Sequence, residues 1–171
     1  EVKYLRKDNN YHVYIRFPDL LHRYNISRHR EEKVFIAVDL QKKKQIFAPK
    51  IKILNKFGIF RNIPVNPAPV LLSQKLMTIL YRKREKGRDF YDVSFLSGKT
   101  KADFSYIKKM TGLGRDEFGN QLLGRCEKLN FKALATDVEP FLFDPGQKER
   151  VLFFRENLPS ILSQAKPPSA Q

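Results

Sequence analysis

Residues 75–82 read KLMTILYR, and residues 86–92, which follow after a gap of three, read KGRDFYD. The first stretch has the spacing of an amphipathic helix. Lys75 and Arg82 are seven residues apart, which is about two helical turns, so both side chains project from the same face. The adjoining apolar stripe predicts that both cations lie at the edge of a hydrophobic core. This stripe consists of Leu72, Leu76, Ile79 and Leu80.

The second stretch predicts a joint between two helices. Gly87 suits the left-handed conformation that ends many helices. Asp89 is a typical N-cap residue for the helix that follows, and is therefore predicted to be a structural cap. The two stretches together bring two cations and two carboxylates, Asp89 and Asp92, to one joint. We expect this joint to be organised for binding anions.

The same residues resemble a known signature. Lys75-Leu76, then Arg82, then the block of residues 87–92 (GRDFYD) are similar to the signature of the AbiEii nucleotidyltransferase family. That family is the toxin side of type IV toxin–antitoxin and abortive-infection systems. The resemblance implies a small nucleotidyltransferase sheet, a helical lobe and a nucleotide cleft between them.

Two further segments are similar to parts of that family. Residues 34–39 (VFIAVD) resemble a strand that ends in an acidic residue, and of the family's usual pattern there only Asp39 is kept. Residues 135–142 (ATDVEPFL) resemble a segment of the helical C-terminal half. With these segments the resemblance covers most of the chain.

One feature that the resemblance implies is missing from the sequence. Nucleotidyltransferases of this class begin with a Gly-Ser or Gly-Gly turn and an Asp-x-Asp pair that holds the metal ion, and the 171 residues contain neither. The nearest acidic pair, Asp137 and Glu139, lies far past the expected position and is interpreted as a helix start. We therefore expect these residues to be the C-terminal part of a longer protein, and to be inactive alone.

The composition predicts a folded chain in a reducing compartment. At 171 residues and 42% hydrophobic content the chain can bury one core, in one or two lobes. The single cysteine, Cys126, excludes an internal disulfide and is interpreted as a small core residue on a helix. No apolar run reaches the ~20 residues of a membrane span, and the first residues lack a signal-peptide pattern. We expect a cytoplasmic protein with no membrane partner.

Other site chemistries find no support in the sequence. The histidines, His12, His22 and His29, do not have the spacing of a zinc site. There is no Gly-x-Ser-x-Gly elbow and no Gly-rich phosphate loop. The hydrolase and P-loop classes are therefore set aside.

Charge indicates the kind of partner. The net charge is +15, from 33 Lys and Arg against 18 Asp and Glu. Such a surplus attracts polyanions, so phosphate-rich partners are the default expectation. Basic residues cluster at residues 42–44, 50–56 and 82–88. The first cluster is interpreted as a solvated loop, whereas the third adjoins the signature.

The order of elements predicts an α+β fold. Strands are expected at residues 11–17, 34–40, 46–54 and 59–63, with a turn at residues 56–58. A short helix is expected from Pro18 to Tyr24. Prolines then break the sheet, and the rest of the chain reads as helix.

A sheet followed by helices indicates a partial, nucleotidyltransferase-like mixed β-sheet and a helical bundle lobe. We assign residues 1–66 to the β-rich part of a nucleotidyltransferase-like domain and residues 67–165 to the helical lobe. Residues 166–171 are predicted to form a flexible tail.

The resemblance suggests three catalytic residues, Asp39, Lys75 and Asp92. Asp39 matches the family's additional acidic residue and is also the candidate metal ligand; its structural alternative is an ordinary Asp at the end of a strand. Lys75 matches a phosphate-contacting lysine, and its alternative is a surface lysine whose stem covers the core. Asp92 is expected to hold the Lys75 ammonium in place, although a carboxylate near a helix start has a structural explanation of its own.

Four cations are candidates for binding nucleotide or RNA: Lys75, Arg82, Arg84 and Arg88. Arg82 could assist Lys75 from the same helix face. Arg88 could instead pair with a nearby carboxylate.

Two functions remain from the sequence. The first is a metal-dependent nucleotidyltransferase toxin, or a domesticated relative, that uses Mg²⁺ and a nucleoside triphosphate to modify an RNA end, with tRNA as the candidate acceptor and a cognate antitoxin as the candidate partner. The second is a noncatalytic basic module, derived from that family, that binds nucleic acid or a protein.

Overall fold

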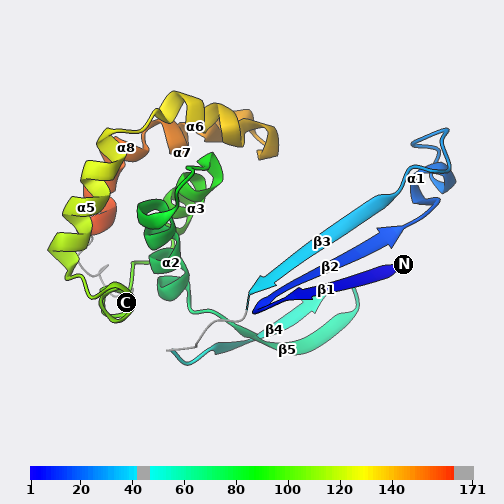
Figure 1. The fold of residues 1–171 in the computed structure, drawn as a ribbon, viewed down its shortest axis with the longest axis horizontal. Coiled ribbons are helices and arrows are strands. Elements are labelled where there is room, and N and C mark those ends of the chain that lie inside the picture. Colours follow the sequence, from blue (N-terminus) through cyan, green and yellow to red (C-terminus); the bar gives the residue numbers. More distant parts are fainter. Residues whose placement is uncertain (42–46, 164–171) are drawn as a thin grey trace. The chain divides into compact units, whose positions relative to one another are not determined.

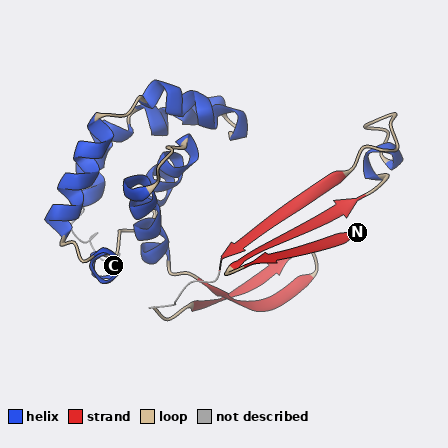
Figure 2. Cartoon of the chain, viewed as in Figure 1, coloured by secondary structure: helices blue, strands red, loops and turns tan. Residues whose placement is uncertain are grey.

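The computed structural model describes residues 1–41 and 47–163 (Figure 1). Strands occupy the first part of the chain and helices most of the remainder, which confirms the α+β class (Figure 2). The chain divides into two compact units, residues 1–48 and residues 49–171. The predicted domain boundary after residue 66 lies one residue past the end of the last strand, β5 (Ile59–Val65). That boundary remains a prediction. The predicted tail, residues 166–171, lies outside the described residues.

The first unit is a three-stranded antiparallel sheet in the order β1-β2-β3. Its strands are β1 (Val2–Lys7), β2 (Asn10–Phe17) and β3 (Val34–Gln41). A two-residue turn joins β1 to β2, and its Asp8 has φ 53°, a conformation that Asp tolerates better than most residues. The helix α1 (Leu20–Arg23) lies in the connection from β2 to β3. The strands at residues 11–17 and 34–40 are thus confirmed, and β1 was not predicted.

The two faces of this sheet differ in chemistry. Cross-strand partners line up Val2 with Ile15 and Ile36, and Tyr4 with Val13 and Val38. Because partners share a face, this face is apolar apart from Arg6, and its Val2, Tyr4 and Ile36 are exposed. The opposite face pairs His12 with Asp39.

The second unit begins with a hairpin of β4 (Lys50–Lys56) and β5 (Ile59–Val65). Phe57 and Gly58 form its two-residue turn, with φ values of 53° and 74°. Positive φ at both central positions matches the twist of the flanking strands. The predicted strands at residues 46–54 and 59–63 correspond to this hairpin, but the first one runs from Lys50 to Lys56, so residues 47–49 are not strand and Lys56 belongs to β4 rather than to the turn. Residue 46 lies outside the described residues. Among the described strands all pairings are antiparallel and form two sheets, so the single mixed sheet expected from the sequence is not found.

Helices complete the second unit. They are α2 (Ala68–Tyr81), α3 (Gly87–Ser97), α4 (Phe104–Thr111), α5 (Arg115–Glu127), α6 (Phe131–Val138), α7 (Glu149–Leu152) and α8 (Phe154–Ser163), with 3-10 turns η1 (Glu139–Phe141) and η2 (Pro145–Lys148). Several begin at side-chain caps: Asp103 Oδ1 accepts from the Tyr106 amide at 2.9 Å, and Asn130 Oδ1 from the Ala133 amide at 3.1 Å. Across the described residues, none of the helices is both long and apolar enough to cross a lipid bilayer.

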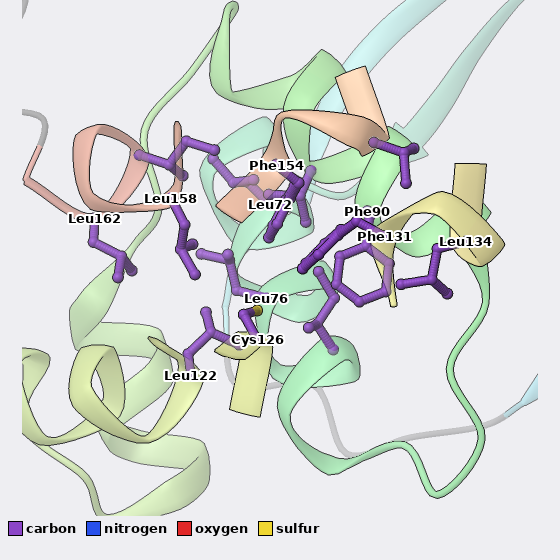
Figure 3. Close-up of a cluster of buried hydrophobic side chains, with 14 of the residues drawn as sticks. Leu72, Leu76, Phe90, Leu122, Cys126, Phe131, Leu134, Phe154, Leu158 and Leu162 are labelled. Atoms are coloured by element: carbon purple, nitrogen blue, oxygen red, sulfur yellow. The ribbon is translucent and has the colours of Figure 1, made fainter. Parts of the chain in front are cut away.

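The helices share one hydrophobic core (Figure 3). Phe90 of α3 makes edge-to-face contacts with Phe131 and Phe154, at centroid distances of 5.4 and 5.0 Å. Leu76 of α2 is fully buried in the same core. Cys126 lies in it as well, on α5, and burial raises the pKa of its thiol to about 11. The interpretation of Cys126 as a core residue on a helix is confirmed.

Candidate functional site

Two helices position the residues of the signature. The buried stripe of α2, which includes Leu72, Leu76 and Ile79, faces the core and leaves Lys75 at the edge with 30% of its side chain exposed. The backbone leaves the helix at Arg82, where φ is −71° and ψ is 129°. Helix α3 begins five residues later, so the joint is a short extended linker.

Asp89 lies at the centre of the joint. It is only 3% exposed, and its two carboxylate oxygens meet different cations. Arg82 Nη1 donates to Asp89 Oδ2, and Lys75 Nζ lies 3.6 Å from Asp89 Oδ1. Lys75 Nζ is also 2.6 Å from Asp92 Oδ2, on the next turn of α3. We call Lys75, Arg82, Asp89 and Asp92 the joint cluster.

This geometry agrees with part of the sequence analysis. Lys75 and Arg82 do reach the same carboxylate, although Arg82 is the C-cap residue that follows α2. Asp92 does contact the ammonium of Lys75, as expected for a residue that holds it in place. The catalytic role of either residue remains a prediction.

Two interpretations of the joint were wrong. Asp89 is not an N-cap: α3 begins at Gly87 after the N-cap residue Lys86, and Asp89 makes ion pairs from within the first turn. Gly87 does not end α2 in a left-handed conformation, because the described glycines with positive φ are Gly58 and Gly112. The physical reason is that α2 stops earlier, at Tyr81.

Gly87 is small for a different reason, which is the close approach of α6. A Cβ atom at this position would lie 2.0 Å from the carbonyl oxygen of Leu134. The Gly87 amide donates to Asp137 Oδ2 at 2.8 Å, so a residue of α6 satisfies the uncapped start of α3. Asp137 lies next to the last residue of α6, Val138. The interpretation of Asp137 as a helix start was therefore wrong. A carboxylate near the C-terminus of a helix is unfavourable, because that end of the helix dipole is negative. An Asp at such a position therefore indicates that its side chain has a partner in another element.

The linker between α2 and α3 is held by a residue that sequence reasoning missed. Arg125 of α5 donates from Nη2 to the carbonyl oxygen of Arg82, and the same Nη2 lies 3.0 Å from Glu85 Oε1. The sequence offers little indication of this contact, because an Arg in the last turn of a helix is common and does not by itself predict a distant partner. Arg84 and Arg88 are exposed, and neither takes part in the ion pairs of residues 1–41 and 47–163.

Asp39 lies in the first unit, on β3. Its Oδ1 is 2.6 Å from His12 Nδ1, and 71% of its side chain is exposed. His12 is the cross-strand partner of Asp39 in the sheet register. The joint cluster lies in the second unit.

The described residues contain no preformed cluster of metal ligands. Mg²⁺ takes carboxylate and water oxygens in an octahedral arrangement. In the part of the chain that the structure describes, no group of three His, Cys, Asp or Glu residues is placed to hold a metal ion. Asp89 and Asp92 are neutralised by Lys75 and Arg82 instead. Asp39 remains a predicted metal ligand without companions from the described residues.

Comparison with known proteins identifies the family. The family model described as "Nucleotidyl transferase AbiEii toxin, Type IV TA system" matches residues 6–162. Searches of curated proteins and of solved structures found no significant match. In general terms this family implies a nucleoside triphosphate, a divalent metal ion and a cognate antitoxin. Because the match spans nearly all of the sequence, the chain belongs to the AbiEii nucleotidyl transferase toxin family and is a nucleotidyltransferase-like toxin domain.

Proposed function

We propose that this chain holds the triphosphate in a nucleotidyltransferase that adds a nucleotide to an RNA end, with tRNA as the first acceptor to test. The position of Lys75 carries this proposal. Its Nζ lies 2.6 Å from Asp92 Oδ2 and 3.6 Å from Asp89 Oδ1, and 30% of its side chain is exposed. Carboxylates hold this ammonium group in position at the surface. It can therefore donate a hydrogen bond to a phosphate oxygen with little further loss of side-chain entropy.

The charge around the joint supports an anionic ligand. The formal charges of the joint cluster cancel, so the four residues alone do not attract a polyanion. Exposed cations in the linker and the first turn of α3 add positive charge; they are Lys83, Arg84, Lys86 and Arg88. The carboxylate of the linker, Glu85, is paired with Arg125. The surplus at this surface is therefore positive, which favours a triphosphate or RNA.

The chemistry of transfer gives roles to Lys75 and Asp92. During transfer the acceptor hydroxyl oxygen forms a bond to the α-phosphorus, the bond to pyrophosphate breaks, and the hydroxyl proton leaves. Negative charge grows on the pyrophosphate, so a positioned ammonium stabilises the transition state more than the ground state. We assign this role to Lys75 and its positioning to Asp92. Asp39 belongs to the first unit and stays a predicted catalytic carboxylate, with no part of this step assigned to it. No step is assigned to a metal ion.

The second candidate is a noncatalytic basic module. One observation favours it: the cations of the joint cluster are already paired with its own carboxylates. Under this hypothesis the exposed cations beside the joint cluster bind nucleic acid or protein, and the joint cluster itself only stabilises the contact between α2 and α3.

A label-transfer assay distinguishes the two functions. The 171-residue chain and the longest product of its gene are each incubated with labelled nucleoside triphosphates, Mg²⁺ and total tRNA. We expect no transfer by the 171 residues alone, because they lack the Asp-x-Asp pair, and transfer only by a gene product that carries such a pair. Robust labelling by the chain alone would contradict the choice of catalytic carboxylates.

Matched variants of whichever gene product shows transfer test the joint cluster. Lys75→Gln and Asp92→Asn should abolish transfer while leaving helical circular dichroism unchanged, because both residues act through charge. The control is Lys148→Gln, since Lys148 forms a similarly exposed ion pair with Glu139 at 2.7 Å elsewhere in the same unit. If the joint variants remain as active as this control, the binding-module hypothesis is the better one.

A further inference from the structure

The β4–β5 hairpin separates its charges onto one face. Cross-strand pairs match Lys50 with Val65, Lys52 with Ile63, Leu54 with Arg61, and Lys56 with Ile59. Because partners share a face and alternate residues point the same way, the four cations of the hairpin project together. The other face contains no charged residue: it carries Ile51, Ile53, Asn55, Phe60, Asn62 and Pro64. We call the first surface the cationic face.

No acidic residue lies close to the cationic face in the sequence. Residues 40–84 contain eleven Lys and Arg and no Asp or Glu, although the chain has 18 acidic residues in all. Lys50, Lys52, Lys56 and Arg61 are all exposed. None of them takes part in the ion pairs of the described residues. This distinguishes the hairpin from the joint, where carboxylates neutralise Lys75 and Arg82.

The turn of the hairpin adds an aromatic side chain in an unfavourable conformation. Phe57 has φ 53°, and 96% of it is exposed. A bulky residue at positive φ is strained, and Asn before Gly would suit this turn better. Neither packing nor turn geometry explains a Phe here. Exposed aromatic rings beside cations are the usual platform on which unpaired bases stack.

We propose that the cationic face and Phe57 form an RNA-binding surface, in which the cations contact successive phosphates and the ring stacks on an unpaired base. Lys50 and Lys52, two residues apart on β4, are separated by roughly 6.6 Å. Arg61 pairs with Leu54, the position between Lys52 and Lys56, so the face presents cations at successive positions along the hairpin. A nucleic acid fits this row better than a protein does, because lysine is depleted in protein interfaces and abundant in nucleic-acid interfaces. The proposal rests on the proposed function in that RNA is the acceptor, and it separates RNA binding by the hairpin from triphosphate binding at the joint.

The first test measures how salt affects the affinity of the 171-residue chain for total tRNA and for poly(U). Replacing Lys50, Lys52, Lys56 and Arg61 with Gln should lower the slope of log affinity against log salt by about 3, because each lost phosphate contact removes ~0.7–0.9. The control replaces four exposed cations of the helical region with Gln: Lys108, Lys109, Lys128 and Lys132. It removes the same charge and should change the slope much less. Equal slopes for the two variants, or an unchanged slope for the hairpin variant, would overturn the proposal.

The second test separates stacking from turn stability. Phe57→Asn should stabilise the hairpin, because it creates an Asn-Gly turn, yet it should weaken poly(U) binding by roughly tenfold. Unchanged or tighter binding would refute the stacking role. An acidic polypeptide, polyglutamate, is added as a competitor at matched charge. If it displaces tRNA more readily than poly(U) does, the face suits an acidic protein and the RNA proposal is wrong.

Failure of this proposal and failure of the proposed function are distinguishable. The binding measurements need neither a triphosphate nor transfer. A loss of transfer in Lys75→Gln with normal RNA binding would support both. An unchanged salt slope in the hairpin variant would refute the hairpin surface whatever the transfer assay shows.

Discussion

Replacing Gly87 with Ala tests the packing that orients the joint cluster. A Cβ atom at residue 87 would lie 2.0 Å from the Leu134 carbonyl oxygen, 3.0 Å from its carbonyl carbon and 3.1 Å from Val138 Cβ. The obstacle is the backbone of α6, which cannot rotate away as a flexible side chain can. Helices α3 and α6 must therefore separate, and the hydrogen bond from the Gly87 amide to Asp137 must lengthen.

Two opposing terms set the size of the effect. Ala is favoured over Gly in a helix by up to about 1 kcal/mol, and overpacking costs typically about 1–3 kcal/mol. Because the contact is with backbone, we take the upper end, which leaves a net loss of about 2 kcal/mol in the free energy of unfolding. In a unit of this size that loss lowers Tm by roughly 5–10 °C.

The assay is urea unfolding followed by helical circular dichroism, which reports mainly on the second unit because α2 to α8 belong to it. The matched control is Gly124→Ala in α5, where a Cβ would meet no atom within 4 Å. Without a clash, this control should gain about 0.5–1 kcal/mol. If Gly87→Ala is as stable as Gly124→Ala, then α3 and α6 do not approach as closely as described, and the reasoning fails.

Two further predictions concern buried groups. Asp89→Asn should lower the free energy of unfolding by about 2 kcal/mol, because a carboxylate that is 3% exposed loses the charge that Arg82 and Lys75 both contact. Asp92→Asn, whose carboxylate is 39% exposed, should cost under about 1 kcal/mol in the same urea experiment, and equal costs would refute the central role of Asp89. Burial raises the pKa of the Cys126 thiol from 9.0 to about 11, so between these values the folded chain keeps a proton that the unfolded chain loses. The free energy of unfolding should therefore fall as pH rises from 9 to 11, by up to about 3 kcal/mol relative to Cys126→Ala, and parallel curves for the two proteins would contradict this.

Features that depend on local periodicity could be predicted from the sequence. Alternation located β2, a near-continuous apolar run located β3, and a spacing of seven residues predicted that Lys75 and Arg82 lie close together. The contact between Lys75 and Asp92 was also expected, since α2 and α3 are neighbours in the chain and a short linker joins them. These features need no information from distant residues.

Features that depend on distant residues could not be predicted in this way. The joint was assigned to Gly87 and Asp89 because those residue types suit a turn and a cap. In the fold, Arg125 holds the linker and Asp137 satisfies the start of α3, and these residues lie 43 and 50 positions from their partners. Their long-range contacts replace the local cap, which leaves Asp89 free to enter the interior and bridge two cations.

Contacts made only on folding also separate the cations of residues 40–84 into two groups. A count of residues 40–84 shows eleven cations and no acid, and it cannot rank them. Folding brings Asp89 and Asp92 back against Lys75 and Arg82, so these cations are already paired and fixed, as a group that contacts one defined triphosphate must be. The cations of the hairpin have no such carboxylates among the described residues, and they keep their side-chain freedom and their full charge. Binding to an RNA backbone of variable shape needs those properties, because its affinity comes from counterion release rather than from a single geometry.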